Sequence, residues 1–294
     1  MLNFHIYDVF TDTPFTGNPL AIVEQADTLT TAQMQTIARQ FNLSETIFIQ
    51  TPDDPTHTAK VRIFFPTDEI PFAGHPTIGC ALHLAGADTA LITLEEVAGL
   101  VPVTITRDGP TPRAEFTTPK LPTPRKAVTD RPLAALAIGL SPDDLSPHCI
   151  GNYEAGPAFI FAGLTDLKTL ARAHVSEPAF AKLVAAAGTN AIYLYTQTGP
   201  NAFRARMFHP NAGVAEDPAT GSATAIFAAQ LNANGALPEV GTTTLHLEQG
   251  VEMGRPSNLR LTIDTDAGDI TAIRVAGQAV KIAHGQIRIP HVPA

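Results

Sequence analysis

The sequence predicts an α+β protein of two pseudo-symmetric domains, each with a sheet wrapped around one central helix. Three observations lead to this prediction. The chain has 294 residues, which is enough for two domains that each bury a core. A motif of the first half recurs in the second half. In both halves, many short strand-like segments accompany one helix that is apolar on all sides, and such a helix is expected inside a sheet.

The repeat is clearest around two prolines, Pro76 and Pro218, at an offset of 142 residues (218 − 76). The two copies are Arg62–Pro66 with Gly74–Ala81, and Arg206–Pro210 with Glu216–Ala223. Each copy predicts a strand, a loop and a helix that starts at the proline, because proline loses no needed N–H there. The exposed amides at a helix start bind anions. Two such ends facing each other across a domain cleft are expected to form a pocket for a small carboxylate.

The first half is predicted to contain strands and two helices. Strands are expected at residues 3–10, 20–23, 46–49, 60–65, 90–95, 101–106 and 113–117. The first helix follows from Met34, Ile37, Ala38 and Phe41, which recur at helical spacing after an N-cap at Thr30 or Thr31. The second helix, short and apolar, is expected from Pro76 to about Gly86.

Residues 119–132 contain four prolines and several charges, and they are predicted to link the two domains. We therefore expect an N-terminal domain at 1–120, joined by a C-terminal strand at about 281–294, and a C-terminal domain at 121–280. The second half repeats the order of the first. Its helices are expected at 176–187 and from Pro218 to about Asn232, and its strands near 158–162, 191–195, 203–208, 244–248, 259–263, 270–275 and 279–283.

Composition excludes several classes of function. Lys and Arg number 19 against 28 Asp and Glu, and no basic run occurs, so neither nucleic acid nor an anionic membrane surface is an expected partner. No apolar stretch reaches the roughly 18 to 20 residues that cross a bilayer, and Met1–Tyr7 lacks a signal-peptide pattern, so a cytoplasmic location is expected. Two cysteines exclude a disulfide scaffold. Motifs for metal or P-loop nucleotide binding do not occur, so no metal or cofactor is expected.

Three residues are candidates for the chemistry. Glu45 lies at a predicted helix–strand junction, and its partner in the repeat, Asn190, is not acidic. A carboxylate on one side of a two-sided pocket suits a proton shuttle with one principal acid/base, although an exposed Glu at a helix end is the alternative. His75 and Asp217 each precede a helix-starting proline. His75 titrates near neutral pH and suits a proton relay, whereas Asp217 is equally suited to an N-cap.

Small residues at the two predicted helix starts are candidates for substrate binding. Gly74, Gly79, Gly221 and Ser222 would let a carboxylate approach the helix amides closely. Gly79 and Gly221 have a second interpretation, in which they permit tight packing of helix on sheet. The two interpretations are compatible.

Three further residues have open interpretations. Cys80, near a helix start, is either an activated thiol or a small core residue, and the core interpretation is favoured. Arg62 and Arg206 occupy matching strand positions. We expect each arginine either to pair with a carboxylate of the protein or of a ligand, or to lie on a solvated strand face.

Four segments together resemble the PhzF-like family, relatives of the phenazine-biosynthesis isomerase that share the diaminopimelate epimerase fold. They are Asp8–Thr11 with Thr16–Ala21, Asn42–Thr46, Phe65–Pro66 with Phe72–Gly79, and Glu216–Ala223. The resemblance spans both halves in order. It implies that each domain is a strongly curved, mostly antiparallel half-barrel around its helix, with the active site between the domains.

The resemblance also implies a reaction. The best-understood member of the family moves a double bond in a dihydro-hydroxyanthranilate by proton transfer, without metal or organic cofactor. Its acid/base corresponds to Glu45, and its ligand contacts correspond to Gly74, His75, Asp217 and Ser222. Related epimerases use a cysteine pair, for which Cys80 has no partner in the repeat. Homodimerisation is common in the family and is expected here.

The expected function is therefore a cofactor-independent isomerase that moves a proton and double bond in a small unsaturated or cyclic carboxylic acid. Catalysis by the single carboxylate of Glu45 at the interdomain cleft is the expected mechanism. Two alternatives remain open. The first is an epimerase or racemase that pairs Glu45 with His75 or Asp217, and the second is a metabolite-binding protein without catalysis.

Overall fold

A computed structural model of the chain describes residues 1–210 and 214–291. The fold is α+β, as predicted. The chain divides into two compact units, one formed by residues 1–119 together with the segment from Val275 onward, and the other by Lys120–Arg274. The division falls after Pro119, where the prediction placed it after residue 120. The segment that returns to the first unit begins earlier than the predicted residue 281.

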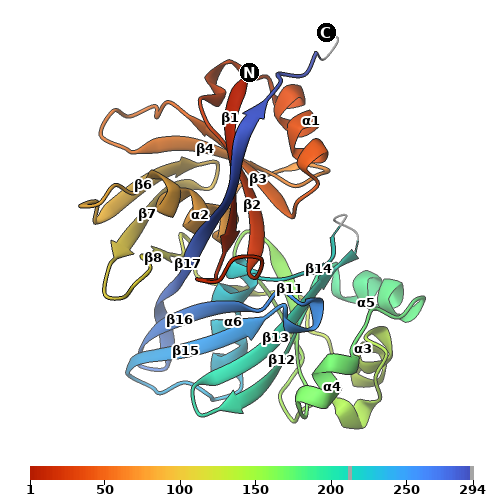
Figure 1. The fold of residues 1–294 in the computed structure, drawn as a ribbon. Coiled ribbons are helices and arrows are strands. Elements are labelled where there is room, and N and C mark those ends of the chain that lie inside the picture. Colours follow the sequence, from red (N-terminus) through yellow and green to blue (C-terminus); the bar gives the residue numbers. More distant parts are fainter. Residues whose placement is uncertain (211–213, 292–294) are drawn as a thin grey trace. The chain divides into compact units, whose positions relative to one another are not determined.

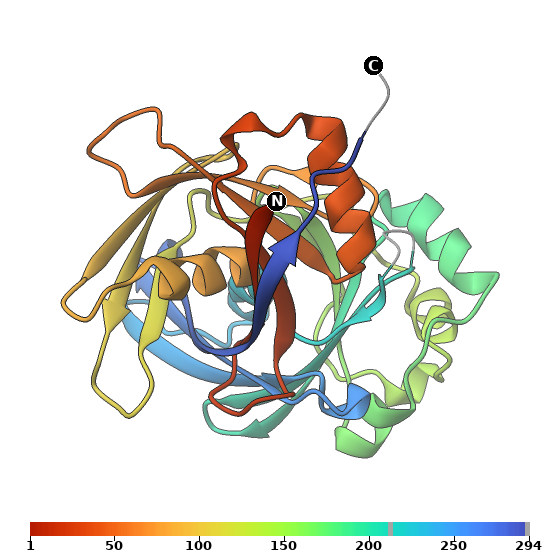
Figure 2. The ribbon, with the colours of Figure 1, turned by 45° about the horizontal axis from the view of Figure 1, so that its top comes forward.

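The described residues of the first unit form eight strands, two α-helices and part of a further strand, and Figure 1 labels most of them. The strands are β1 (Leu2–Val9), β2 (Asn18–Val23), β3 (Glu45–Gln50), β4 (Ala59–Phe64), β5 (Glu69–Ile70), β6 (Leu91–Glu96), β7 (Gly99–Thr106) and β8 (Arg113–Thr117). The helices are α1 (Thr31–Phe41) and α2 (Gly74–Leu84), with a 3-10 turn at Ala26–Thr28. The long strand β17 (Asp269–Ile287) enters this unit and pairs antiparallel with β1, and Figure 2 shows the two side by side.

The second unit contains the strands β9 (Thr123–Pro124), β10 (Gly151–Glu154), β11 (Ala158–Gly163), β12 (Ile192–Gly199), β13 (Ala202–His209), β14 (Val214–Asp217), β15 (Gly241–Gln249), β16 (Ser257–Asp266) and the start of β17. Its α-helices are α3 (Arg131–Ala137), α4 (Leu167–Arg172), α5 (Ala179–Ala187) and α6 (Gly221–Ala233). Short 3-10 turns lie at Pro142–Asp144 and Val251–Met253. Among the helices of both described segments, none has the length and apolar character needed to cross a membrane.

Strand pairing repeats between the two units. In the first unit β2 and β3 are parallel, β4 is antiparallel to both β3 and β5 and parallel to β6, and β6 is antiparallel to β7. In the second unit β11 and β12 are parallel, β13 is antiparallel to both β12 and β14 and parallel to β15, and β15 is antiparallel to β16. The central helices α2 and α6 occupy the same place in this order. The predicted internal repeat therefore extends to the topology of the sheets.

Both central helices are buried, as their apolar circumference predicted. In α2, every residue from Gly74 to Ala81 is buried, and in α6 nine of the residues are buried. Gly79 lets α2 pack closely on the sheet, because a Cβ at this position would lie 2.5 Å from Cδ2 of Leu20 and 2.8 Å from Cγ2 of Val9. The packing interpretation of Gly79 is thus confirmed.

Replacement of Gly79 by Val is expected to destabilise the protein. Leu20 and Val9 are fully buried and have no space into which to move, so overpacking should cost about 3 kcal/mol of the free energy of unfolding. Gly86→Val is the matched control, because its Cβ would meet only Thr89 Oγ1, at 3.5 Å. Thermal unfolding of the two variants measures the difference. Equal melting temperatures would contradict this account of the packing.

The predicted first helix and its N-cap are confirmed. Thr30 caps α1 through a capping box with Gln33, and the predicted apolar face, including Met34 and Ile37, is buried against the sheet. Asn42 ends the helix in a left-handed conformation, with φ of 52°. The chain then turns directly into β3.

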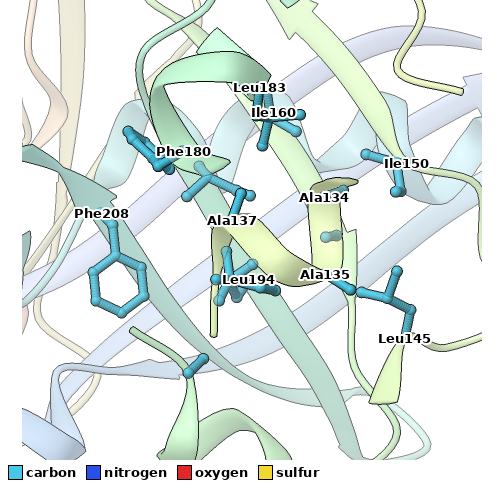
Figure 3. Packing of buried hydrophobic residues seen from close by; sticks show 14 of the residues in the cluster. Ala134, Ala135, Ala137, Leu145, Ile150, Ile160, Phe180, Leu183, Leu194 and Phe208 are labelled. Atoms are coloured by element: carbon cyan, nitrogen blue, oxygen red, sulfur yellow. The ribbon is translucent and has the colours of Figure 1, made fainter. Parts of the chain in front are cut away.

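The helices α3 and α4 were missed by the sequence analysis. Pro132 was interpreted as part of a linker, whereas it lies in the first turn of α3 behind the N-cap Asp130. The six residues of α4 are too few to show a helical period. Figure 3 shows the core that α3 and α5 form with β11 and β12. Its labelled members are Ala134, Ala135, Ala137, Leu145, Ile150, Ile160, Phe180, Leu183, Leu194 and Phe208.

The starts of both central helices differ from the prediction. Helix α2 begins at Gly74, two residues before Pro76, and α6 begins at Gly221, three residues after Pro218. The reason in the second unit is strand pairing, because Asp217 is still paired with Met207 as the last residue of β14. The two predicted strands at 270–275 and 279–283 are likewise one continuous strand, β17.

Candidate active site

In the first unit, Glu45 and His75 lie side by side. Glu45 is the first residue of β3, where it pairs in parallel register with Leu20 of β2. Its side chain is buried, and Oε2 lies 3.2 Å from Nδ1 of His75, the second residue of α2. The alternative of an exposed Glu at a helix end is therefore wrong.

His75 is a neutral imidazole at physiological pH. Burial lowers its pKa to about 3, although a hydrogen bond to the backbone of Pro19 acts in the opposite direction. The contact with Glu45 is consequently one between a carboxyl group and a neutral imidazole, not an ion pair. This pair can take up or release a proton without burying a second charge.

Asn18 is a third member of this cluster. It begins β2, is fully buried, and places Nδ2 3.4 Å from the same Nδ1 of His75. Its amide can donate to Nδ1 in the tautomer of His75 that carries the ring proton on Nε2. Asn18 was quoted only as part of a motif in the sequence analysis, and no role was assigned to it. The run Thr16–Ala21 was the available signal.

Gly74 and His75 are the first two residues of α2. The N–H groups at the start of a helix have no carbonyl acceptor within the helix itself. The first bond of the ladder runs from the Thr77 N–H to the Ala73 carbonyl, at 3.2 Å. Amides at the start of an 11-residue helix carry partial positive charge and attract anions. The predicted binding residue Gly74 therefore adjoins the pair formed by Glu45 and His75.

A second buried carboxyl group, from β6, contacts α2 at Thr77, two residues after His75. Glu96, the last residue of β6, places Oε1 2.7 Å from Oγ1 of Thr77. Burial raises the pKa of Glu96 to about 8, although the hydrogen bond from Thr77 lowers it. Thr77 Oγ1 is also 2.7 Å from the Ala73 carbonyl, which can only accept. One hydroxyl proton cannot serve both acceptors at once, and a protonated Glu96 removes the competition because it can donate to Thr77 Oγ1 while Thr77 donates to Ala73.

In the second unit, Asp217 belongs to a buried network. Its Oδ2 accepts a 2.6 Å hydrogen bond from Thr220 Oγ1, and its backbone carbonyl accepts one of 2.7 Å from Gln249 Nε2. The Thr220 N–H donates back to Gln249 Oε1 at 3.2 Å. The N-cap of α6 is Thr220, so the interpretation of Asp217 as the N-cap is wrong. Gly221 and Ser222 are the first two residues of α6, as Gly74 and His75 are of α2.

Strand register corrects one alignment of the repeat. Thr46 lies opposite Phe64, and Ile192 lies opposite Phe208, which matches Phe64 in the repeat. Glu45 therefore corresponds to Ala191, not to Asn190. The conclusion that the second unit offers no acid at this position is unchanged.

The two predicted arginines bind protein carboxylates. Arg62 makes a bidentate pair with Glu69, at 2.7 and 2.6 Å, and Arg206 makes one with Glu216, at 2.7 and 2.8 Å. Each guanidinium also lies over a phenylalanine two residues along its strand, at 5.3 and 4.8 Å from the ring centre. These equivalent pairs show the repeat at the level of side chains. They hold the short strands β5 and β14 against the sheet.

Cys80 is a core residue, as the sequence analysis favoured. It is fully buried, and burial together with the nearby Glu96 raises the pKa of its thiol. A thiol that stays protonated is a poor nucleophile or base. This environment does not suit the paired-cysteine chemistry of the related epimerases.

Comparison with known proteins supports a single family. A model of the phenazine biosynthesis-like proteins, PhzC-PhzF, matches residues 7–285. An uncharacterized isomerase of Mesorhizobium japonicum is 39% identical, over 98% of this chain and 99% of the relative. A trans-2,3-dihydro-3-hydroxyanthranilate isomerase of Pseudomonas fluorescens is 36% identical, over 98% and 99%. The crystal structure of a PhzF-family phenazine biosynthesis protein of Bacillus anthracis superposes with a TM-score of 0.86 at 25% identity, covering 98% and 99%.

Two repeated α+β units, each built around a buried helix, and full-length similarity to named isomerases together define an isomerase. The fold and the enzyme class predicted from the sequence are confirmed. The chain belongs to the phenazine biosynthesis-like (PhzC-PhzF) family.

Proposed function

We propose that this isomerase moves a proton, and with it a double bond, in a small unsaturated or cyclic carboxylic acid by acid/base catalysis at Glu45. The observation that carries the proposal is the buried Glu45 carboxylate, 3.2 Å from the neutral imidazole of His75. The Pseudomonas fluorescens relative is named for trans-2,3-dihydro-3-hydroxyanthranilate, which is an acid of this class.

The proposed reaction is balanced without an added reactant. Glu45 takes a proton from the carbon next to a double bond, and the electron pair of the broken C–H bond forms a new double bond to the neighbouring carbon. The electron pair of the original double bond moves to its far carbon, where Glu45 returns the proton and a new C–H bond forms. His75 and Asn18 accept and donate hydrogen bonds as Glu45 changes its protonation state. No group is oxidised or reduced.

The substrate needs hydrogen-bond donors near its carboxylate, because negative charge develops there when the proton leaves carbon. We propose that the amides of Gly74 and His75 in α2, and those of Gly221 and Ser222 in α6, supply these donors. Asp217 is proposed to position a substrate hydroxyl or amine by accepting a hydrogen bond. The helix starts and the local contacts in each unit support these roles.

Reaction in deuterated water tests the proposal. We expect trans-2,3-dihydro-3-hydroxyanthranilate, or a member of a panel of unsaturated and cyclic carboxylic acids, to show a change in ultraviolet absorbance as the double bond moves. NMR of the product should then place deuterium at the newly saturated carbon. Label at an inverted stereocentre without double-bond movement would instead establish an epimerase. Binding of acids with neither double-bond movement nor label in any of them would establish a metabolite-binding protein.

A further inference from the structure

Three potential metal ligands meet at the end of α2 that lies away from His75. Glu24 follows directly after β2, and its Oε1 lies 3.0 Å from Nε2 of His5 in β1 and 3.0 Å from Nε2 of His83 in α2. The three ligand atoms all lie within 4.8 Å of one another. Each side chain is largely buried, with 14%, 30% and 10% of His5, Glu24 and His83 exposed.

The fold of the first unit brings these residues together. His5 lies directly opposite Ile22 in the pairing of β1 with β2. Glu24 is two residues beyond Ile22, so His5 and Glu24 lie on the same face of the sheet. Helix α2 packs on this face, as the close approach of Gly79 to Leu20 shows. His83, in the last turn of α2, therefore projects toward His5 and Glu24.

The surroundings also resemble those of a metal ligand set. The hydroxyl of Tyr7 lies 3.1 Å from Nδ1 of His83, and such a partner on the second ring nitrogen orients a ligating imidazole.

We propose that His5, Glu24 and His83 form a binding site for a divalent transition-metal ion, with Zn²⁺ as the ion it binds. Two imidazoles and one carboxylate are a zinc ligand set, and three protein ligands leave one position for water. Tetrahedral zinc with bonds of about 2.0 to 2.1 Å separates its ligand atoms by about 3.3 Å. The separations here approach that value, so small side-chain rotations accommodate the ion.

The charges of the site are suited to a cation. The last turn of an α-helix carries partial negative charge, and His83 lies in the last turn of α2. Glu24 adds a full negative charge that offsets the repulsion from nearby Lys281. His75 and His83 are eight residues apart, or about 12 Å along the helix axis, so the metal site is separate from Glu45. Bound zinc would tie β1, the end of β2 and α2 together.

Isothermal titration calorimetry of the tag-free full chain with ZnCl₂, after treatment with EDTA, tests the proposal. We expect saturable binding of one ion per chain. Glu24→Gln and His83→Gln should each weaken binding about 100-fold or more, and Tyr7→Phe about 10-fold, as loss of an orienting partner does. His57→Gln is the matched control, because His57 contacts Glu95 at 2.7 Å and belongs to no three-ligand group in the described residues. Its affinity for zinc should stay within twofold of the original.

Two further measurements make the result independent of any one variant. Zinc should raise the melting temperature of the unsubstituted protein, and of His57→Gln, but not that of Glu24→Gln or His83→Gln. Cobalt(II) in place of zinc should give the intense visible bands of a tetrahedral site. A chain that binds no zinc stoichiometrically, or whose affinity falls equally in His57→Gln, would overturn the proposal. The cluster would then be a hydrogen-bonded His–Glu–His group only.

Discussion

Glu45→Gln is expected to lower kcat about 10³-fold while leaving the fold and substrate binding intact. Gln has nearly the shape of Glu and can keep a hydrogen bond to Nδ1 of His75, but it cannot carry a proton between two carbons. General acid/base groups contribute about 10² to 10⁴-fold to rate, and here one carboxylate is proposed to act in both directions. The rate of double-bond movement by ultraviolet absorbance, on the substrate found in deuterated water, measures the loss.

The control for Glu45→Gln is Glu115→Gln, which makes the same chemical change on β8 of the same unit. Its kcat should stay within about twofold of the original. Substrate affinity by calorimetry should be similar in both variants, because the amides of α2 and α6 are unchanged. If Glu45→Gln has the kcat of the original protein, Glu45 is not the acid/base of the reaction. The assignment of the chain to its family does not depend on this result.

Glu96 is expected to make the protein less stable as the pH rises. Its pKa in the folded protein is about 8, above the ordinary value of 4.5. A raised pKa means that the folded state holds the proton more tightly, so the stabilisation is complete below pH 4.5 and is lost as the pH rises through 8. Between pH 5.5 and 8.5 this one group should cost about 3 kcal/mol of the free energy of unfolding.

Glu96→Gln isolates this effect, because Gln resembles the protonated acid and does not titrate. Buried histidines such as His75, whose pKa is lowered, act in the opposite direction, but they titrate equally in both proteins. Relative to the original protein, Glu96→Gln should therefore gain about 3 kcal/mol of unfolding free energy when the pH rises from 5.5 to 8.5. Urea denaturation at both pH values measures it.

The adjacent residue supplies the control for this pH dependence. Hydrogen bonds from the backbone N–H groups of Asp54 and Asp53, and from His57, lower the pKa of Glu95 to about 2. Glu95 is therefore ionised throughout the range from pH 5.5 to pH 8.5. In a His57→Gln background, which removes the histidine that contacts it, Glu95→Gln should change the unfolding free energy by a constant amount. If the difference in unfolding free energy between Glu96→Gln and the original is also the same at both pH values, Glu96 is ionised in the folded protein.

Local patterns predicted most of the elements. The capping box of α1, the apolar circumference of α2 and α6, and the alternating strands depend on residues close in sequence, so their positions were predicted to within a few residues. The start of α6 was predicted wrongly because Pro218 has two local uses, in a helix start and in a turn. Pairing of Asp217 with Met207 decides between them, and that contact is not local in sequence.

The candidate site was predicted in part. Glu45 and His75 were identified as separate residues, and the structure of the first unit places them in contact. Asn18 lay in a segment that carries the family resemblance, but no role was assigned to it, and Glu96 and the group around Glu24 had no sequence signal of their own. Each depends on strand register or on the face that α2 presents to the sheet. The roles of Asp217, Gly221 and Ser222, the shared cleft and the homodimer stay predictions.

The amino-acid sequence by itself determined that the chain repeats a strand–loop–helix unit, that each unit surrounds an apolar helix, and that only one half carries an acid at the start of its third strand. Only the tertiary structure decided that this acid is buried against a neutral histidine, and that His5, Glu24 and His83 converge. The physical reason is the range of the interactions. Caps and periodicity act within one or two turns, whereas proton affinity and ligand geometry depend on burial and on neighbours from distant strands.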